Sequence, residues 1–108
     1  MGVTKSDNFT AKQNKLSNVL KALAHPARIA IIQQLIRAEH CICTDFVNEV
    51  GLAQATISQH LNELKEVGII KGCIEGNSVS YCINEKVWNQ IRKELDAFFT
   101  AYEPNQNC

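Results

Sequence analysis

Two short helical segments joined by a tight turn and followed at once by a β-hairpin constrain the fold of this chain more than any other feature. The first segment, residues 44–50, carries an apolar face and ends at a glycine, which suits a helix C-terminus. The second segment, residues 54–67, places Ile57, Leu61 and Leu64 on one helical face. Two helices joined across a glycine-containing turn of about three residues are a helix-turn-helix. The pattern therefore predicts that motif.

The hairpin is predicted over residues 69–83, as two short strands separated by Gly76-Asn77, a dipeptide suited to a primed turn. Pairing across this turn sets Glu75 opposite Ser78, and alternate residues then point to opposite faces. One face carries Ile70, Ile74, Val79, Tyr81 and Ile83, and the other carries Lys71, Cys73, Ser80 and Cys82. We expect the first face to pack and the second to meet solvent or DNA.

Three further helices are predicted from apolar residues at helical spacing, over residues 8–24, 26–38 and 85–102. The middle one begins at a proline, which is favoured at the first helical position, and its apolar sides make it the central buried helix. The last one carries a wide aromatic stripe, and residues 104–108 are expected to be a disordered tail. The expected fold is a single domain over residues 1–108, mainly α with a small β-hairpin (α+β), in the winged helix-turn-helix order.

Composition by itself does not indicate a nucleic-acid partner. Lysine plus arginine total 11 and aspartate plus glutamate total 11, so the formal net charge is zero. A basic surface must therefore come from local placement, and few phosphate contacts would give a modest salt dependence. No apolar run approaches the ~18 residues that cross a bilayer, so a membrane role is not expected.

The five cysteines are an odd number, and the N-terminal segment lacks the pattern of a secretory signal. We therefore expect a cytoplasmic protein whose thiols are free, bind metal or sense oxidants. Cys73 and Cys82 lie diagonally across the predicted hairpin. They are expected to be two free thiols, and a disulfide in the wing is the alternative.

The outward side chains of the second helix of the motif suit a helix that reads a DNA groove. In the winged-helix order this helix enters the major groove and the hairpin flanks it. Glutamine can pair bidentately with adenine, and serine or threonine can reach bases or phosphates. The DNA-binding candidates are Gln54, Ala55, Thr56, Ser58, Gln59, His60, Lys65, Lys71, Arg28 and Asn77. For Arg28, a structural ion pair at the start of its helix is an equal alternative.

Four segments make the chain resemble the ArsR/SmtB family, and they span about residues 15–100. They are LAHPARIAII at 23–32, HCICTD at 40–45, GLAQATISQHLNELKEVGII at 51–70 and VSYCIN at 79–84. The resemblance implies a dimer built on the first and last helices, DNA recognition by residues 54–67, and release from the operator when an effector binds. Two departures are that Ala53 stands where the family commonly has a capping serine, and that the wing tip lacks an arginine.

The apolar stripes of the first and last helices agree with a homodimer, because a 108-residue domain has limited core in which to hide them. The interface candidates are Leu16, Leu20, Trp88, Ile91, Leu95, Phe98, Phe99 and Tyr102. A two-fold dimer would set two recognition helices roughly one duplex turn apart, which predicts an inverted-repeat operator. The alternative is that the aromatic residues complete the core of a monomer.

Cys41 and Cys43 lie where arsenic- and cadmium-responsive members of the family place paired thiolates, at the start of the first helix of the motif. Soft sulfur ligands select ions such as As(III), Cd, Pb or Zn, and a helix N-terminus stabilises thiolates. His40 and Cys108 are candidates for further ligands. Phe46 stands where the arsenic pattern has another cysteine, and no histidine follows the hairpin to supply the zinc pattern of the last helix. Ordinary buried cysteines and redox sensing stay open as alternatives.

The sequence therefore predicts a repressor that binds double-stranded DNA as a homodimer, with a soft metal ion or metalloid, or a thiol-reactive compound, as the hypothetical effector. It contains no glycine-rich phosphate loop and no nucleophile elbow, so an enzyme is not expected. One alternative is a winged-helix protein-interaction module, which would suit the neutral charge. The other is a regulator without metal sensing.

Overall fold

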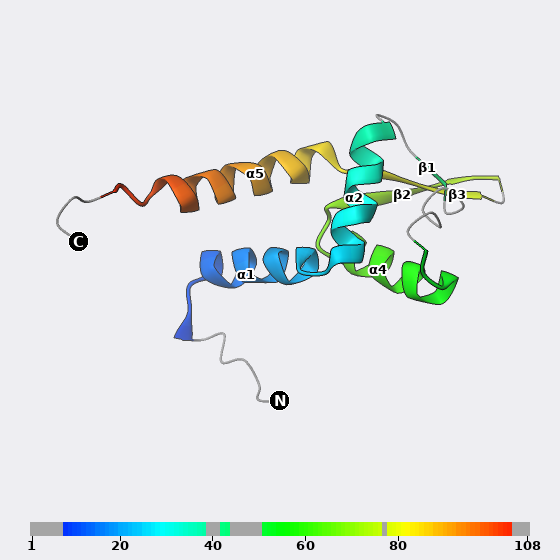
Figure 1. The fold of residues 1–108 in the computed structure, drawn as a ribbon. Coiled ribbons are helices and arrows are strands. Elements are labelled where there is room, and N and C mark those ends of the chain that lie inside the picture. The colour runs from blue at the N-terminus through cyan, green and yellow to red at the C-terminus, as the bar shows by residue number, and fades with distance from the viewer. Residues whose placement is uncertain (1–7, 39–41, 44–50, 77, 105–108) are drawn as a thin grey trace.

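The computed structural model describes residues 8–38, 42–43, 51–76 and 78–104. Its elements are α1 (Ala11–Leu23), α2 (Pro26–Ala38), β1 (Ile42–Cys43), α4 (Gln54–Glu66), β2 (Ile70–Glu75), β3 (Ser78–Ile83) and α5 (Glu85–Thr100). Helices α1 and α5 extend together to one side of α2, and α4 lies with the strands on the other side (Figure 1). This mainly helical order with a hairpin confirms the predicted winged helix-turn-helix. The helix predicted over 44–50 lies outside the described residues.

Helix α1 begins later than its apolar periodicity predicted, because a capping box fixes its start. The Thr10 Oγ1 accepts a hydrogen bond from the Gln13 backbone N–H at 3.0 Å, and the Gln13 Oε1 accepts one from the Thr10 backbone N–H at 2.9 Å. The two side chains satisfy two amide groups that a helix start leaves without partners. A threonine followed three residues later by glutamine was the readable signal for this boundary.

The hairpin has the predicted register, with Glu75 opposite Ser78. A third strand, β1, pairs antiparallel with β3 to give the order β1-β3-β2. The sequence did not predict β1, because two residues are too short to show a period. On the face expected to pack, Ile70 is buried, whereas Ile74 is 79% exposed. The expectation therefore holds at the base of the wing and is wrong at its tip, which extends beyond the core.

The centre of the core joins α2, α4 and the start of the hairpin. Its fully buried side chains are Ile31, Ile57, Leu61, Leu64, Ile69 and Ile70. Burying a side chain of this size stabilises a fold by about 1.5–3 kcal/mol. Three of the six belong to α4, so the core fixes which face of that helix points outward. The buried residues of α2 also confirm its predicted place as the central helix.

Gly68 links α4 to the hairpin with a φ of 85°, a conformation that costs other residues about 1–2 kcal/mol. A Cβ at this position would also lie 3.4 Å from the Val87 Cγ2 atom. We expect Gly68→Ala to lower the free energy of unfolding by about 1–2 kcal/mol in urea denaturation. Gly72→Ala is the matched control, because its Cβ would meet nothing closer than 3.7 Å and its φ is not left-handed. Equal losses in the two variants would contradict this reasoning.

Candidate nucleic-acid interface

The outer face of α4 presents short polar side chains to solvent. Ala55, Thr56, Ser58 and Gln59 are exposed, whereas Ile57 between them is fully buried. Ala53, the residue before the helix, makes no side-chain cap, because alanine has no hydrogen-bonding atom in its side chain. The first amide groups of α4 are therefore not capped by that residue, and such groups favour phosphate. Gln54 is the first residue of α4, and its side chain lies outside the described part of the structure.

Two lysines lie on α4 and on the strand that contacts it, β2. Lys65 near the end of α4 and Lys71 on β2 are both exposed. The Lys65 Nζ reaches over β2, to 3.8 Å from the point where a Cβ on Gly72 would lie. The place of these two cations beside the polar face agrees with the expectation of a few local phosphate contacts. Asn77, the wing candidate, lies outside the described residues.

The expectation that His60 contacts DNA is wrong, because its side chain is only 7% exposed. Its Nδ1 accepts a hydrogen bond from the Nε of Arg28 at 2.9 Å. His60 follows Ile57 by three residues and precedes Leu61, so helical geometry places it on the inner face of α4. The spacing of His60 from Ile57 and Leu61 therefore indicated an inward position, although a polar residue such as histidine is more often expected on the surface.

Arg28 is correspondingly a structural residue rather than a phosphate contact. Besides His60, it binds the backbone of α1, because its Nη1 donates to the Ala22 carbonyl oxygen at 3.1 Å. The alternative that Arg28 has a structural role at the start of its helix therefore agrees with the structure. Its side-chain partner, however, is a histidine, so the contact is not the expected ion pair with a carboxylate. His25 completes the cluster, with its ring centroid 4.3 Å from that of His60 and its Nδ1 accepting from the Ala27 N–H at 3.0 Å.

The surroundings of His60 favour its neutral form. Burial lowers the pKa of His60 below its ordinary value, and the neighbouring His25 and Arg28 lower this pKa further. Glu63 acts in the opposite direction and is the smallest of the four influences. A histidine that accepts at Nδ1 from an arginine must carry its proton on Nε2, since arginine is a donor only. Hydrogen bonding and electrostatics therefore agree that this imidazole is uncharged.

The candidate metal ligands His40, Cys41 and Cys108 lie outside the described residues. Cys43 lies in β1, opposite Ser80 of β3, and the helix expected to follow it, over residues 44–50, lies outside the described residues. Within the described residues, no three histidine, cysteine, aspartate or glutamate side chains come together as a metal site.

The two cysteines of the wing differ from the expectation of two free thiols. Cys73 is free, so the alternative of a Cys73–Cys82 disulfide is also wrong. Cys82 is disulfide-bonded, and its partner is not Cys73.

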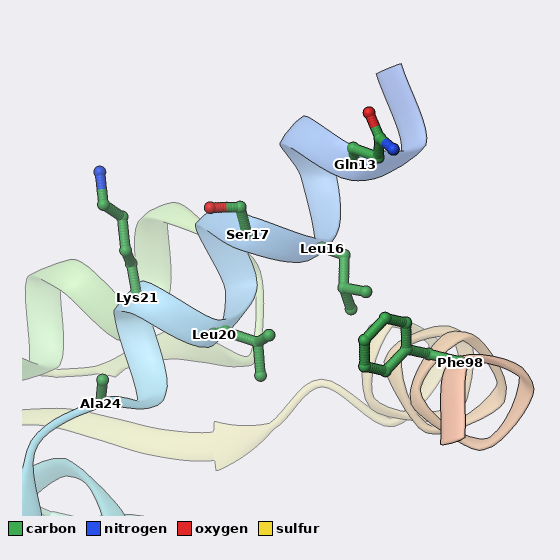
Figure 2. A pocket seen from close by; sticks show the side chains of 7 residues that line it. All are labelled: Gln13, Leu16, Ser17, Leu20, Lys21, Ala24 and Phe98. Carbon is green, nitrogen blue, oxygen red and sulfur yellow. The ribbon is translucent and has the colours of Figure 1, made fainter. Parts of the chain in front are cut away.

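Helices α1 and α5 form an apolar groove on the side away from the wing. The groove has a volume of about 460 Å³, with Leu16 and Leu20 of α1 facing Phe98 of α5 across it (Figure 2). An exposed ion pair, Lys15 Nζ to Glu94 Oε1 at 3.3 Å, connects the same two helices.

The interface candidates divide into two groups. Ile91 belongs to the core, and Trp88 and Leu95 pack against that core, so the expectation that Ile91 is an interface residue is wrong. By contrast, Leu20 (42%) and Phe98 (58%), which line the groove, are exposed, as are Phe99 (68%) and Tyr102 (73%) farther along the chain. Phe9, just before α1, is 54% exposed and was not among the candidates. The last turns of α5 therefore keep a large apolar surface that the subunit does not bury itself.

None of the described helices is long and apolar enough to cross a membrane.

The chain matches known proteins over the region that carries these features. Residues 25–71 match the family described as bacterial regulatory protein, arsR family. An uncharacterized HTH-type transcriptional regulator from Methanocaldococcus jannaschii is 35% identical over 86 residues, which are 79% of this chain and 96% of that protein. A homologue of the cadmium resistance transcriptional regulatory protein CadC from Staphylococcus aureus is 35% identical over 92 residues, 82% of this chain and 75% of the relative.

Among solved structures, a homodimeric winged helix-turn-helix DNA-binding domain from Mycobacterium bovis, a possible ArsR-family regulator, superposes with a TM-score of 0.65. The match covers 97% of this chain and 98% of that one, at 23% identity. At this identity the likeness supports the fold alone.

Proposed function

The chain belongs to the ArsR/SmtB family of winged helix-turn-helix transcriptional regulators, which are not enzymes, and we propose that it represses transcription as a homodimer on an inverted-repeat operator. The observation that carries this proposal is the outer face of α4, where Thr56, Ser58 and Gln59 are exposed on a helix anchored by three fully buried apolar residues and by His60. A rigidly held helix with hydrogen-bonding side chains is what base readout in a major groove requires. The chain acts as a single domain in the cytoplasm, where it meets DNA.

A protein-interaction module explains this face less well. The centres of protein interfaces are enriched in aromatic residues and arginine, and the described exposed positions of α4 hold neither. The lysines beside the helix, Lys65 and Lys71, suit phosphate contacts at the edge of a groove. DNA is therefore the partner that the surface chemistry favours.

The homodimer rests on the apolar surface that α1 and α5 leave exposed. Leu20 and Phe98 line one groove, the ring of Phe99 contacts that of Phe98, and Tyr102 is exposed just after α5, and exposed apolar side chains of this kind mark an interface. A second copy seated there would lie opposite the wing and leave α4 of both subunits free (Figure 1). The Mycobacterium bovis domain, which has the same fold, is described as homodimeric, in agreement with an assembly of two copies.

Enrichment of duplexes from a random-sequence library tests this function. We expect the purified protein to select an inverted repeat whose half-sites lie about one duplex turn, roughly 10 base pairs, apart. Affinity for the selected duplex should exceed affinity for unrelated DNA by about a thousandfold or more. Selection of no motif would refute the proposal.

We further propose that in the reduced protein, where no disulfide occupies these thiols, a soft metal ion or metalloid, such as Cd, Pb, Zn or As(III), binds at Cys41 and Cys43 and releases the DNA. Thiolates select such ions, and the Staphylococcus aureus relative is named for cadmium resistance. The strand β1 that holds Cys43 pairs with β3 of the wing, so an ion bound there would act on the strand that flanks the DNA. His40 and Cys108 are the candidates for further ligands.

Replacing Cys41 and Cys43 by serine is expected to leave DNA affinity unchanged and to abolish release by cadmium. Serine keeps the size of the side chain but removes the soft ligand. The measurement is fluorescence anisotropy of the selected duplex during titration with cadmium chloride under reducing conditions, which open the disulfide of Cys82 in every variant. Cys73→Ser is the matched control, because Cys73 is a free thiol in the wing. A double variant that still releases DNA at the same cadmium concentration would place the sensor elsewhere.

A further inference from the structure

The partly buried cluster of Arg28, His60 and His25 connects three helices through a single guanidinium group. Arg28 lies in the first turn of α2, its Nε donates to His60 of α4, and its Nη1 donates to the carbonyl oxygen of Ala22 in α1. The other buried residues of α4 are apolar, and apolar contacts restrict direction less than hydrogen bonds do. The Arg28–His60 bond joins a side chain of α4 directly to α2.

We infer that Arg28 and His60 are positioning residues for DNA recognition, which set the rotation of α4 relative to α1 and α2. This inference rests on the proposed function, because it assumes that the outer face of α4 reads DNA. His60 is followed on the helix by the buried Leu61 and preceded by the exposed Gln59. A rotation of α4 that breaks the bond between His60 and Arg28 therefore also turns the Gln59 side chain away from the direction in which it would meet DNA.

The bond requires a neutral His60. Arginine offers only N–H donors, so protonation of the Nδ1 of His60 would remove the acceptor and set two cations side by side. The groups that face His60 are Arg28 of α2, His25 before α2 and Glu63 of α4 itself. Two of these three repel a proton on His60, and Glu63 alone favours it.

The sign of the pH effect follows from this arrangement. The pKa of His60 lies below its ordinary value of 6.5 in the folded protein, so the folded state binds fewer protons than the unfolded state. The contribution of the bond is therefore complete above pH 6.5 and declines as the pH falls below that value. Simple electrostatics predicts the opposite for DNA, because protonated histidines add positive charge and strengthen binding to phosphate.

The test compares the ratio of affinities for the library-selected duplex and for an unrelated duplex. Arg28→Met keeps the stem of the side chain but removes the donor, and we expect it to lower this ratio about tenfold. His60→Phe removes the acceptor and should do the same, and the double variant should lose no more than either single variant. His60→Asn keeps an acceptor near the place of Nδ1 and should stay within about twofold of the wild type.

The pH profile separates positioning from general stability. Between pH 8 and pH 5 we expect the ratio of the wild-type protein to fall about threefold or more, and that of His60→Asn to stay constant. If Arg28→Met does not fold, this comparison decides the question with two folded proteins. Equal pH profiles, or a folded Arg28→Met with the wild-type ratio, would overturn the inference.

Failure of the proposed function would be seen separately. If the wild-type protein selects no duplex, α4 does not read DNA, and the positioning contact is then measured by hydrogen exchange. Arg28→Met should speed the exchange of α4 amides more than that of α5 amides. Equal acceleration in the two helices would overturn the inference even in that case.

Discussion

The variant with alanine in place of both Gln54 and Gln59 should bind the library-selected duplex about a hundredfold more weakly than the wild-type protein. Gln59 is exposed on the outer face of α4, and Gln54 is the first residue of that helix. A bidentate contact between glutamine and adenine contributes about 1–3 kcal/mol, and 1.4 kcal/mol is a factor of ten. Two lost contacts therefore account for about two orders of magnitude.

Affinity for unrelated DNA should not change in this variant, because alanine removes no charge. The core is also unaffected, since the buried face of α4 is intact, and the urea midpoint should stay within experimental error of the wild type. Gln90→Ala is the matched control, because it makes the same exchange at an exposed position of α5. Wild-type affinity in the double variant would show that α4 is not the reader.

A variant with two charged residues in the groove between α1 and α5 should be a monomer that no longer recognises the operator. Leu20→Glu with Phe98→Glu places two carboxylates in the apolar groove that these residues line (Figure 2). Burying them at an interface would require desolvation without partners, which costs several kcal/mol for each charge. We expect sedimentation equilibrium to give the mass of one chain, where the wild type gives two.

The effect on DNA follows from the loss of the second recognition helix. Two linked half-site contacts bind up to 10²–10⁴ times more tightly than one, so the monomer should lose at least about a hundredfold in affinity. Gln90→Glu is the control for added negative charge on α5, and Phe98→Leu is the control for a groove that stays apolar. A charged double variant that remains dimeric would place the interface elsewhere.

The order of helices and the register of the hairpin were predictable because both depend on local patterns. Apolar residues at helical spacing gave α2, α4 and α5 to within two residues, and the Gly76-Asn77 turn set the pairing of Glu75 with Ser78. The two-residue strand β1 was not predictable, because its pairing with β3 depends on tertiary contact.

The misplaced site residues have a common physical cause. Arg28 and His60 are 32 residues apart, and a polar residue on an apolar face shows its partner only when the chain is folded. Similarly, Ile91 and Phe98 belong to one apolar stripe of α5, yet the first is buried and the second is 58% exposed. Spacing identifies the stripe, but only the folded chain shows where its own core ends.

The central claim is that the outer face of α4 enters a major groove twice in each assembly. Methylation protection at guanine N7 tests it most directly, because that atom lies in the major groove. The selected duplex is prepared with guanines in both half-sites. We predict two protected segments about 10 base pairs apart on one face of this DNA. A bound duplex protected in one segment only, or in no major-groove position, would contradict the account.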